Sequence, residues 1–146
     1  MWRSNAGFSL LELILSISLI AVLAGISLPI YRGFQLNNQL DVAADMIAET
    51  SRRAQLLSQV GDRDSAHGIH IGSGELVMFT GDSYAARQGE YDETFSLSEQ
   101  LEFVGLSEVV FAEVTGLPDV TGSINITALN NATRSLQLSA LGVIEY

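Results

Sequence analysis

Residues 7–30 have the sequence GFSLLELILSISLIAVLAGISLPI, in which Glu12 is the only charged side chain. The apolar part, residues 8–30, is long enough to supply the ~20 residues that a helix needs to span the hydrocarbon core of a bilayer. An ionised group at membrane depth is costly and usually marks a site with a partner. We therefore expect one transmembrane helix over residues 8–30, with Glu12 acting in assembly.

Glu12 lies four residues after Phe8, which separates the two by about 6 Å along the axis of a helix. At that spacing a free amine on a neighbouring chain could reach the Glu12 carboxylate. The alternative is a carboxylate that extends from near the helix end to the membrane interface. We favour the assembly role and keep the interfacial role open.

The spacing of Gly7, Phe8, Glu12 and Pro29 resembles the N-terminus of type IV pilins and type II secretion pseudopilins. The resemblance implies that residues 1–7 are a leader, which a membrane prepilin peptidase cuts after Gly7. It also implies that the new N-terminal amine of Phe8 is methylated. In this family the glutamate at the position of Glu12 pairs with the N-terminal amine of a neighbouring subunit.

The expected cleavage site lies before the apolar run, whereas a secretory signal peptide is cut behind its shorter apolar region. The anchor would therefore be retained. Charge gives no clear orientation, because Arg3 precedes the span and Arg32 follows it. The resemblance implies a single-pass protein of the bacterial inner membrane, with its C-terminal part in the periplasm or outside the cell.

The composition limits the remaining possibilities. The 146 residues carry a formal net charge of −10, contain no cysteine, and have arginine as their only cationic residue apart from histidine. An acidic surface of this kind repels nucleic-acid phosphates, so a nucleic-acid partner is not expected. The absence of cysteine excludes disulfides and thiolate metal sites. We expect no cofactor.

Residues 31–60 have the pattern of an amphipathic helix that continues the apolar one. Gly61 should end it, because glycine tolerates the left-handed conformation beyond a helix C-terminus. Pro29 predicts a kink or local unwinding, although a proline at a membrane boundary is also ordinary. The apolar stripe consists of Leu36, Leu40, Ala43, Ile47, Thr50, Ala54 and Leu57, and the opposite side, expected to face solvent or other subunits, carries Asn37, Asp41, Asp45, Glu49 and Arg53.

Short runs rich in β-branched and aromatic residues follow in the β-rich region, residues 61–146. Residues 123–128 and 135–139 should pair as a hairpin through a turn with asparagines. The polar segment 81–93 should form an exposed excursion. The expected fold is α+β, with one long N-terminal helix packed on an antiparallel sheet. The other expected strands are residues 68–71, 76–79, 95–97, 101–104, 109–111 and 143–146.

A looser likeness covers residues 52–55, 110–111, 122–126 and 139–143, which resemble the H-type minor pseudopilins and the FimT-type minor pilins. This likeness implies a minor subunit. The last twenty-six residues contain Glu145 as their only acid, unlike the acidic C-terminal loop expected of a calcium-binding major pseudopilin.

Other candidate chemistry is sparse. His67 and His70 should point to opposite faces of a strand, so a metal site is not expected there. Asp62, Asp64 and Ser65 are typical of a turn rather than an ion site. The tripeptides that begin at Asn125 and Asn131 match a glycosylation pattern that also occurs by chance.

An enzyme is not expected. Nucleophilic catalysis would need a serine or threonine with an adjacent base and an orienting carboxylate, and the sequence has no cysteine and only two histidines, both in one short expected strand. We interpret the chain as a structural subunit. The expected partners are prepilin peptidase, other pilin or pseudopilin subunits and the inner membrane. The alternatives are an anchored extracytoplasmic binding module that does not polymerise and a minor pilin for DNA uptake.

Overall fold

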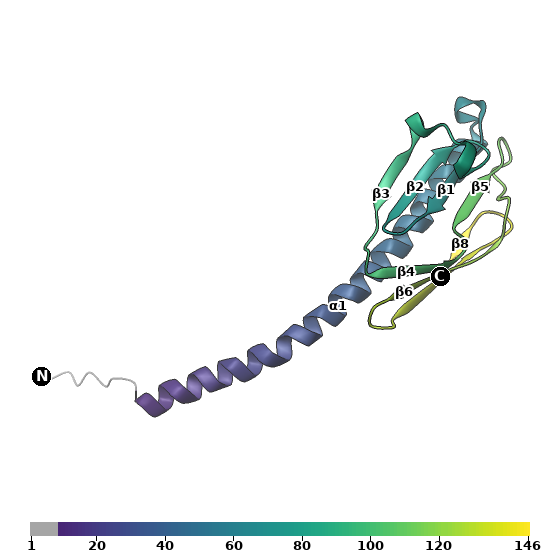
Figure 1. Cartoon of the computed structure of the whole chain (residues 1–146). Helices are drawn as coiled ribbons and strands as arrows, with labels where there is room; N and C mark the ends of the chain where they lie inside the picture. The colour runs from purple at the N-terminus through teal and green to yellow at the C-terminus, as the bar shows by residue number, and fades with distance from the viewer. Residues whose placement is uncertain (1–8) are drawn as a thin grey trace, which may run out of the picture. The chain divides into compact units, whose positions relative to one another are not determined.

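The computed structural model describes residues 9–146, apart from the side chains of residues 26–30 and 32. The predicted leader and its cleavage site, Gly7 and Phe8, therefore lie outside the described residues. The chain divides into two compact units, Met1–Gln35 and Leu36–Tyr146. A single helix, α1 (Leu10–Gln59), begins in the first unit and ends in the second (Figure 1).

The end of α1 agrees with the prediction from Gly61. The N–H of Val60 donates to the carbonyl of Leu56 at 3.0 Å, and the N–H of Gly61 donates to the carbonyl of Ser58 at 3.2 Å. Gly61 has φ 66° and ψ 37°, the left-handed conformation that satisfies helix carbonyls without a Cβ clash. A single-turn helix, η1 (Asp62–Asp64), then leads to the first strand.

Within residues 9–146 the strands form two antiparallel sheets of four, whereas the sequence predicted one sheet. The first sheet has the order β3-β2-β1-β5 and the second has the order β4-β6-β7-β8. The first contains β1 (His67–Ile71), β2 (Glu75–Thr80), β3 (Glu93–Ser96) and β5 (Glu108–Phe111). The second contains β4 (Leu101–Gly105), β6 (Gly122–Ala128), β7 (Thr133–Leu138) and β8 (Ile144–Glu145).

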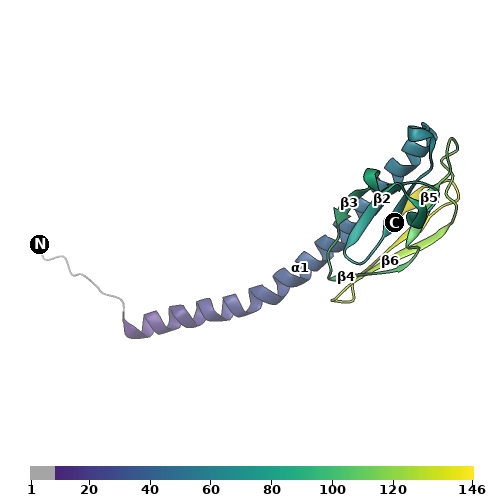
Figure 2. The same cartoon turned by 45° about the horizontal axis from the view of Figure 1, so that its top comes forward.

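The C-terminal half of α1 supplies the core that both sheets need. Leu40 and Ile47 are fully buried, as is Ala54 one to two turns further on. They share one hydrophobic cluster with Ile69 of β1 and Ile126 of β6. Figures 1 and 2 show the strands lying along this half of the helix. The predicted apolar stripe is confirmed, and the fold is α+β as expected.

The outer face of the first sheet holds a second, smaller cluster. Phe79 of β2 is 1% exposed and packs with Ala66 and Val110. A Cβ on Gly68 would lie 2.5 Å from Cζ of Phe79 and 2.7 Å from the carbonyl oxygen of Val109. Glycine at residue 68 is therefore what lets the Phe79 ring lie across β1.

The predicted hairpin forms between β6 and β7. The two strands pair antiparallel with Ile124 opposite Leu136, and both side chains are buried. In the turn, Asn131 has φ 61°, and the N–H of Ala132 donates to the side-chain oxygen of Asn130 at 3.2 Å. The asparagines thus take the turn roles expected of them.

The segment between β2 and β3 is exposed, as predicted, but it is also fixed to the sheet. It contains two short helical turns, η2 (Tyr84–Ala86) and η3 (Gly89–Tyr91). The Tyr84 ring stacks on His70 at 3.9 Å, with Arg87 at 3.9 Å from the same ring. This stacking could not be predicted from the sequence, because His70 lies in β1 whereas Tyr84 and Arg87 lie in the segment after β2.

Candidate assembly interface

The first turn of α1 is capped by its own serine. The backbone N–H of Glu12 donates to Oγ of Ser9 at 3.2 Å, and the N–H of Leu13 donates to the carbonyl of Ser9 at 3.2 Å. Ser9 and Glu12 thus have the spacing of a capping box, in which serine and glutamate stand three residues apart. The sequence pattern that could have predicted this cap was already present in residues 9–12.

Glu12 is exposed, and its carboxylate makes no hydrogen bond or ion pair with the described residues. A negative charge in the first helical turn is favoured by the helix dipole, by about 0.3–1 kcal/mol at an exposed site. The Glu12 carboxylate is therefore not destabilising in the isolated chain, and it remains available to bind a cation from another chain.

The polar side chains further along this helix are satisfied internally. Oγ of Ser16 donates to the carbonyl of Glu12 at 2.8 Å, and Oγ of Ser18 donates to the carbonyl of Ile14 at 2.7 Å. Serine hydroxyls that bond to the preceding turn need no partner from lipid or another chain. Within residues 9–25, Glu12 is consequently the side chain whose polar group remains unpaired.

Apolar side chains surround the same stretch of helix on every side. All residues from 9 to 25 are exposed, with Leu10 at 78% and Leu13, the least exposed of the large apolar residues, at 53%. A helix that is apolar all round is normally buried in lipid or protein. The large exposed side chains are Leu10, Leu11, Leu13, Ile14, Leu15, Ile17, Leu19, Ile20, Val22 and Leu23.

Among the residues that the structure describes, no helix is both long enough and apolar enough to cross a membrane.

Pro29 lies within α1, which is assigned as helix without interruption from Leu10 to Gln59. Pro29 therefore does not end the helix. Its side chain is not described, and the predicted kink stays a prediction.

Polar side chains of α1 fasten the helix to the second sheet. Nε of Arg134 donates to Oδ1 of Asp41 at 2.8 Å, and Oη of Tyr146 donates to Oδ1 of Asp45 at 2.7 Å. The bond to Asp45, with a smaller contribution from burial, raises the pKa of Tyr146 to about 12.

A salt bridge also joins α1 to the first sheet. Arg53 makes a two-pronged salt bridge to Glu93 of β3, at 2.6 and 2.7 Å. Asp41, Asp45 and Arg53 were expected to face solvent or other subunits. They are exposed, yet they also bind the chain's own strands, which the sequence could not indicate because their partners lie 40 to 101 residues away.

The two histidines point to opposite faces of β1, as predicted. His67 is 1% exposed and lies toward α1, with its Nε2 3.4 Å from Oδ2 of Asp62. His70 lies on the outer face against Tyr84. In the described part of the chain, no group of three or more histidine or carboxylate side chains is placed to hold a metal ion.

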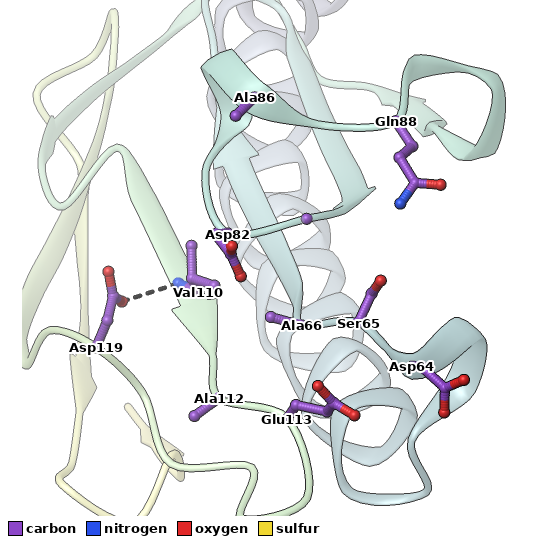
Figure 3. Close-up of a pocket in the computed structure, with 11 residues that line it drawn as sticks. Asp64, Ser65, Ala66, Asp82, Ala86, Gln88, Val110, Ala112, Glu113 and Asp119 are labelled. Atoms are coloured by element: carbon purple, nitrogen blue, oxygen red, sulfur yellow. Dashed lines mark hydrogen bonds between the residues drawn. The ribbon is translucent and has the colours of Figure 1, made fainter.

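An acidic cavity of about 560 Å³ opens at one end of the first sheet (Figure 3). Asp64 at the end of η1, Asp82 after β2 and Glu113 after β5 line it. Asp119 also lines it, and its Oδ1 accepts the backbone N–H of Val110 at 2.9 Å. This last carboxylate thus has a structural role at the edge of β5.

Comparison with known families identifies the N-terminal stretch. Residues 2–28 match the model of the prokaryotic N-terminal methylation motif, the prepilin-type signal of type IV pilins and pseudopilins. Neither the comparison with curated proteins nor that with solved structures returns a match.

The motif has consequences for the class of protein. It implies processing by prepilin peptidase, membrane anchoring through the N-terminus and assembly with pilin-type subunits. It supports a type IV pilin-like or pseudopilin role and points to a structural subunit rather than an enzyme. The α+β fold, with its N-terminal helix packed on antiparallel sheets, is consistent with pilin-like architecture.

Proposed function

We propose that this chain is a minor structural subunit of a type II secretion pseudopilus or a type IV pilus. Prepilin peptidase cuts after Gly7, and the new amine of Phe8 is methylated. Residues 8–30 then anchor the chain in the inner membrane, with residues 61–146 on the periplasmic or extracellular side. The observation that carries this proposal is the helix of exposed apolar side chains inside the stretch that matches the methylation motif.

Assembly rests on covering these apolar side chains with those of neighbouring subunits. Burial of apolar surface contributes about 25 cal/mol per Å² when the surface leaves water, but little when it leaves lipid. The position of one subunit's helix along its neighbour's helix must therefore be set by a polar contact. We assign this contact to the Glu12 carboxylate and the amine of a neighbour's Phe8, because Glu12 lacks a partner within the described chain.

The charges of the C-terminal unit favour a protein-binding subunit over a DNA-uptake pilin. Four of its five arginines are engaged in salt bridges within the described residues, which leaves little free positive charge for phosphates. The paired arginines are Arg53, Arg63, Arg87 and Arg134.

Cleavage is tested by replacing Gly7 with leucine in the full chain. The bulky side chain should block the peptidase, so the protein should keep its leader and show no shift on a gel. Mass spectrometry should find intact Met1 in this variant and methylated Phe8 in the parent. Ala6→Leu is the control, and normal trimming of the Gly7→Leu chain would contradict the assigned site.

Polymerisation is tested by cross-linking, since the chain has no cysteine of its own. A single Leu19→Cys substitution on the apolar helix should give disulfide-linked dimers in native membranes. Glu102→Cys, on the exposed surface of β4, is the control and should give few. A Leu19→Cys chain that remains monomeric under oxidation would favour an anchored module that does not polymerise.

A further inference from the structure

The first sheet has two edges, and the chain covers only one of them. Beside β5, the N–H of Asp119 donates to the carbonyl of Val110, and the N–H of Ala112 donates to the carbonyl of Leu117. On the other side, β3 pairs with β2 alone, and no described backbone group bonds to its outer edge. An edge strand with unpaired N–H and C=O groups can accept a further strand.

The open edge of β3 borders an apolar groove against α1, which we call the α1/β3 groove. Its main part has a volume of about 380 Å³ and is lined by Val42, Met46 and Phe95. A second cavity of about 200 Å³ continues it past Leu97 and shares Val42 and Met46. Val42 is half exposed, so part of this apolar surface lies open to solvent.

The groove lies where the side chains of an added strand would fall. Phe95 of β3 is half-buried and faces α1, as does Glu93, which bonds to Arg53, whereas Thr94 and Ser96 are exposed. A new strand would sit ~4.8 Å from β3, with alternate side chains directed to the same face. Its inward side chains would therefore contact Val42 and Met46 while its backbone bonds to β3.

The charge around the groove indicates which kind of added strand would bind there. Asp45 and Glu49 line it, and neither forms a salt bridge with a described residue. The one arginine in the lining, Arg53, is already neutralised by Glu93. The groove is thus net negative, and a second copy of this acidic chain is a poor occupant.

We propose that the α1/β3 groove binds an extended segment of another protein, which adds a strand to β3. The segment has apolar side chains at alternate positions, which contact Val42 and Met46. It also carries lysine or arginine close to them, which pairs with Asp45 and Glu49. Strand addition of this kind takes affinity from main-chain hydrogen bonds and specificity from alternate side chains. The site is independent of assembly through residues 8–30.

The test uses the full-length chain in detergent micelles and a fluorescent peptide of alternating valine and lysine. Saturable binding is expected by anisotropy. A peptide methylated on alternate backbone nitrogens, on the edge that would face β3, should bind at least about tenfold more weakly, because it cannot donate those hydrogen bonds. A peptide with glutamate in place of lysine should also bind more weakly, because its charge has the same sign as Asp45 and Glu49.

Matched variants locate the site. Val42→Arg, on the exposed side of α1, should abolish binding, whereas Leu129→Arg, in the exposed β6–β7 turn, should not change it. Hydrogen exchange should slow in residues 93–96 when the peptide binds and stay unchanged in β4, which is also an edge strand.

Four results would overturn the proposal. They are no saturable binding of the valine-lysine peptide, equal affinity for its backbone-methylated form, equal affinity for Val42→Arg, and an apparent peptide affinity that falls as the chain concentration is raised, because copies of the chain then occupy each other's grooves. The last result would identify a second copy as the occupant.

Discussion

Glu12 occupies the first turn of α1, where its backbone N–H bonds to Ser9 and its carboxylate has no partner among the described residues. The two parts of the residue therefore have separate tasks. The backbone belongs to the helix cap, and the charge remains available for the contact between chains that we propose.

Replacing Glu12 with alanine should reduce incorporation into filaments while cleavage of the leader continues. Loss of one partner of a buried ion pair can cost ~3–5 kcal/mol, and the effect here should be smaller because the amine that is left lies at a chain end. Glu12→Gln, which keeps the size and loses the charge, should behave like the alanine variant. Quantitative blotting of sheared filaments measures this, and normal incorporation of both variants would show that the charge is not needed.

Tyr146 gives a test of the contact between α1 and the end of β8. Its pKa of about 12 is above the usual value of 10, so the neutral phenol is favoured in the folded chain. The stabilisation is complete below about pH 10 and is lost as the pH rises toward 12. Because Tyr146 is mostly exposed, solvent screening should keep the effect below about 1 kcal/mol.

Tyr146→Phe should therefore lower the free energy of unfolding at pH 8. In the parent chain this free energy should fall further between pH 10 and 12 as Tyr146 loses its proton, and the phenylalanine variant should lack that fall. Denaturant titration of the full chain in detergent at several pH values measures this. An unchanged decline in the phenylalanine variant would assign the effect to other groups.

At the scale of elements, the half of α1 that packs on the sheets was predictable and its polar attachments were not. Leu40 and Ile47 recur with the helical period, and that period is a local property of the sequence. The bonds from Arg134 to Asp41 and from Arg53 to Glu93 depend on which strands lie beside the helix, which a single sequence does not specify.

The same reasoning applies to the sheets. The existence of most strands followed from β-branched and aromatic runs, but the division into two sheets depends on long-range pairing, such as β4 with β6 across about twenty residues. At the N-terminus of α1, the assembly role of Glu12 follows from the motif and stays a prediction, whereas the cap by Ser9 matches a sequence pattern that was not recognised.

Ile47→Ala should destabilise the C-terminal unit by about 2–5 kcal/mol, because the side chain is fully buried between the helix and the sheets. Val42→Ala, on the exposed side of the same helix, should cost much less. Thermal unfolding of both full-length variants in detergent compares them. Equal costs would mean that the helix is not held by this stripe.

At the scale of the whole molecule, the acidic charge acts against association. In residues 36–146 sixteen acidic residues stand against five arginines, so neighbouring C-terminal units repel each other. The repulsion acts over about 10 Å at 0.1 M salt and about 3 Å at 1 M salt. In the assembly that we propose, the N-terminal helix must therefore drive association against this repulsion.

Raising the salt concentration should consequently increase disulfide cross-linking of the Leu19→Cys chain in reconstituted membranes. A decrease in cross-linking would mean instead that ion pairs between the C-terminal units hold neighbouring chains together. The cysteine on β4, Glu102→Cys, reports directly on whether these units approach each other.

The cap at the start of α1 also bears on how subunits would align. Because Oγ of Ser9 already accepts the N–H of Glu12, an approaching carboxylate finds one donor fewer at the helix end itself. In the pairing that we propose, the cationic target is the terminal amine, which is a single point rather than a diffuse dipole. Each arriving subunit would then stop at the same longitudinal offset from the last, and a uniform stagger would be built into the fibre by the tip of every helix.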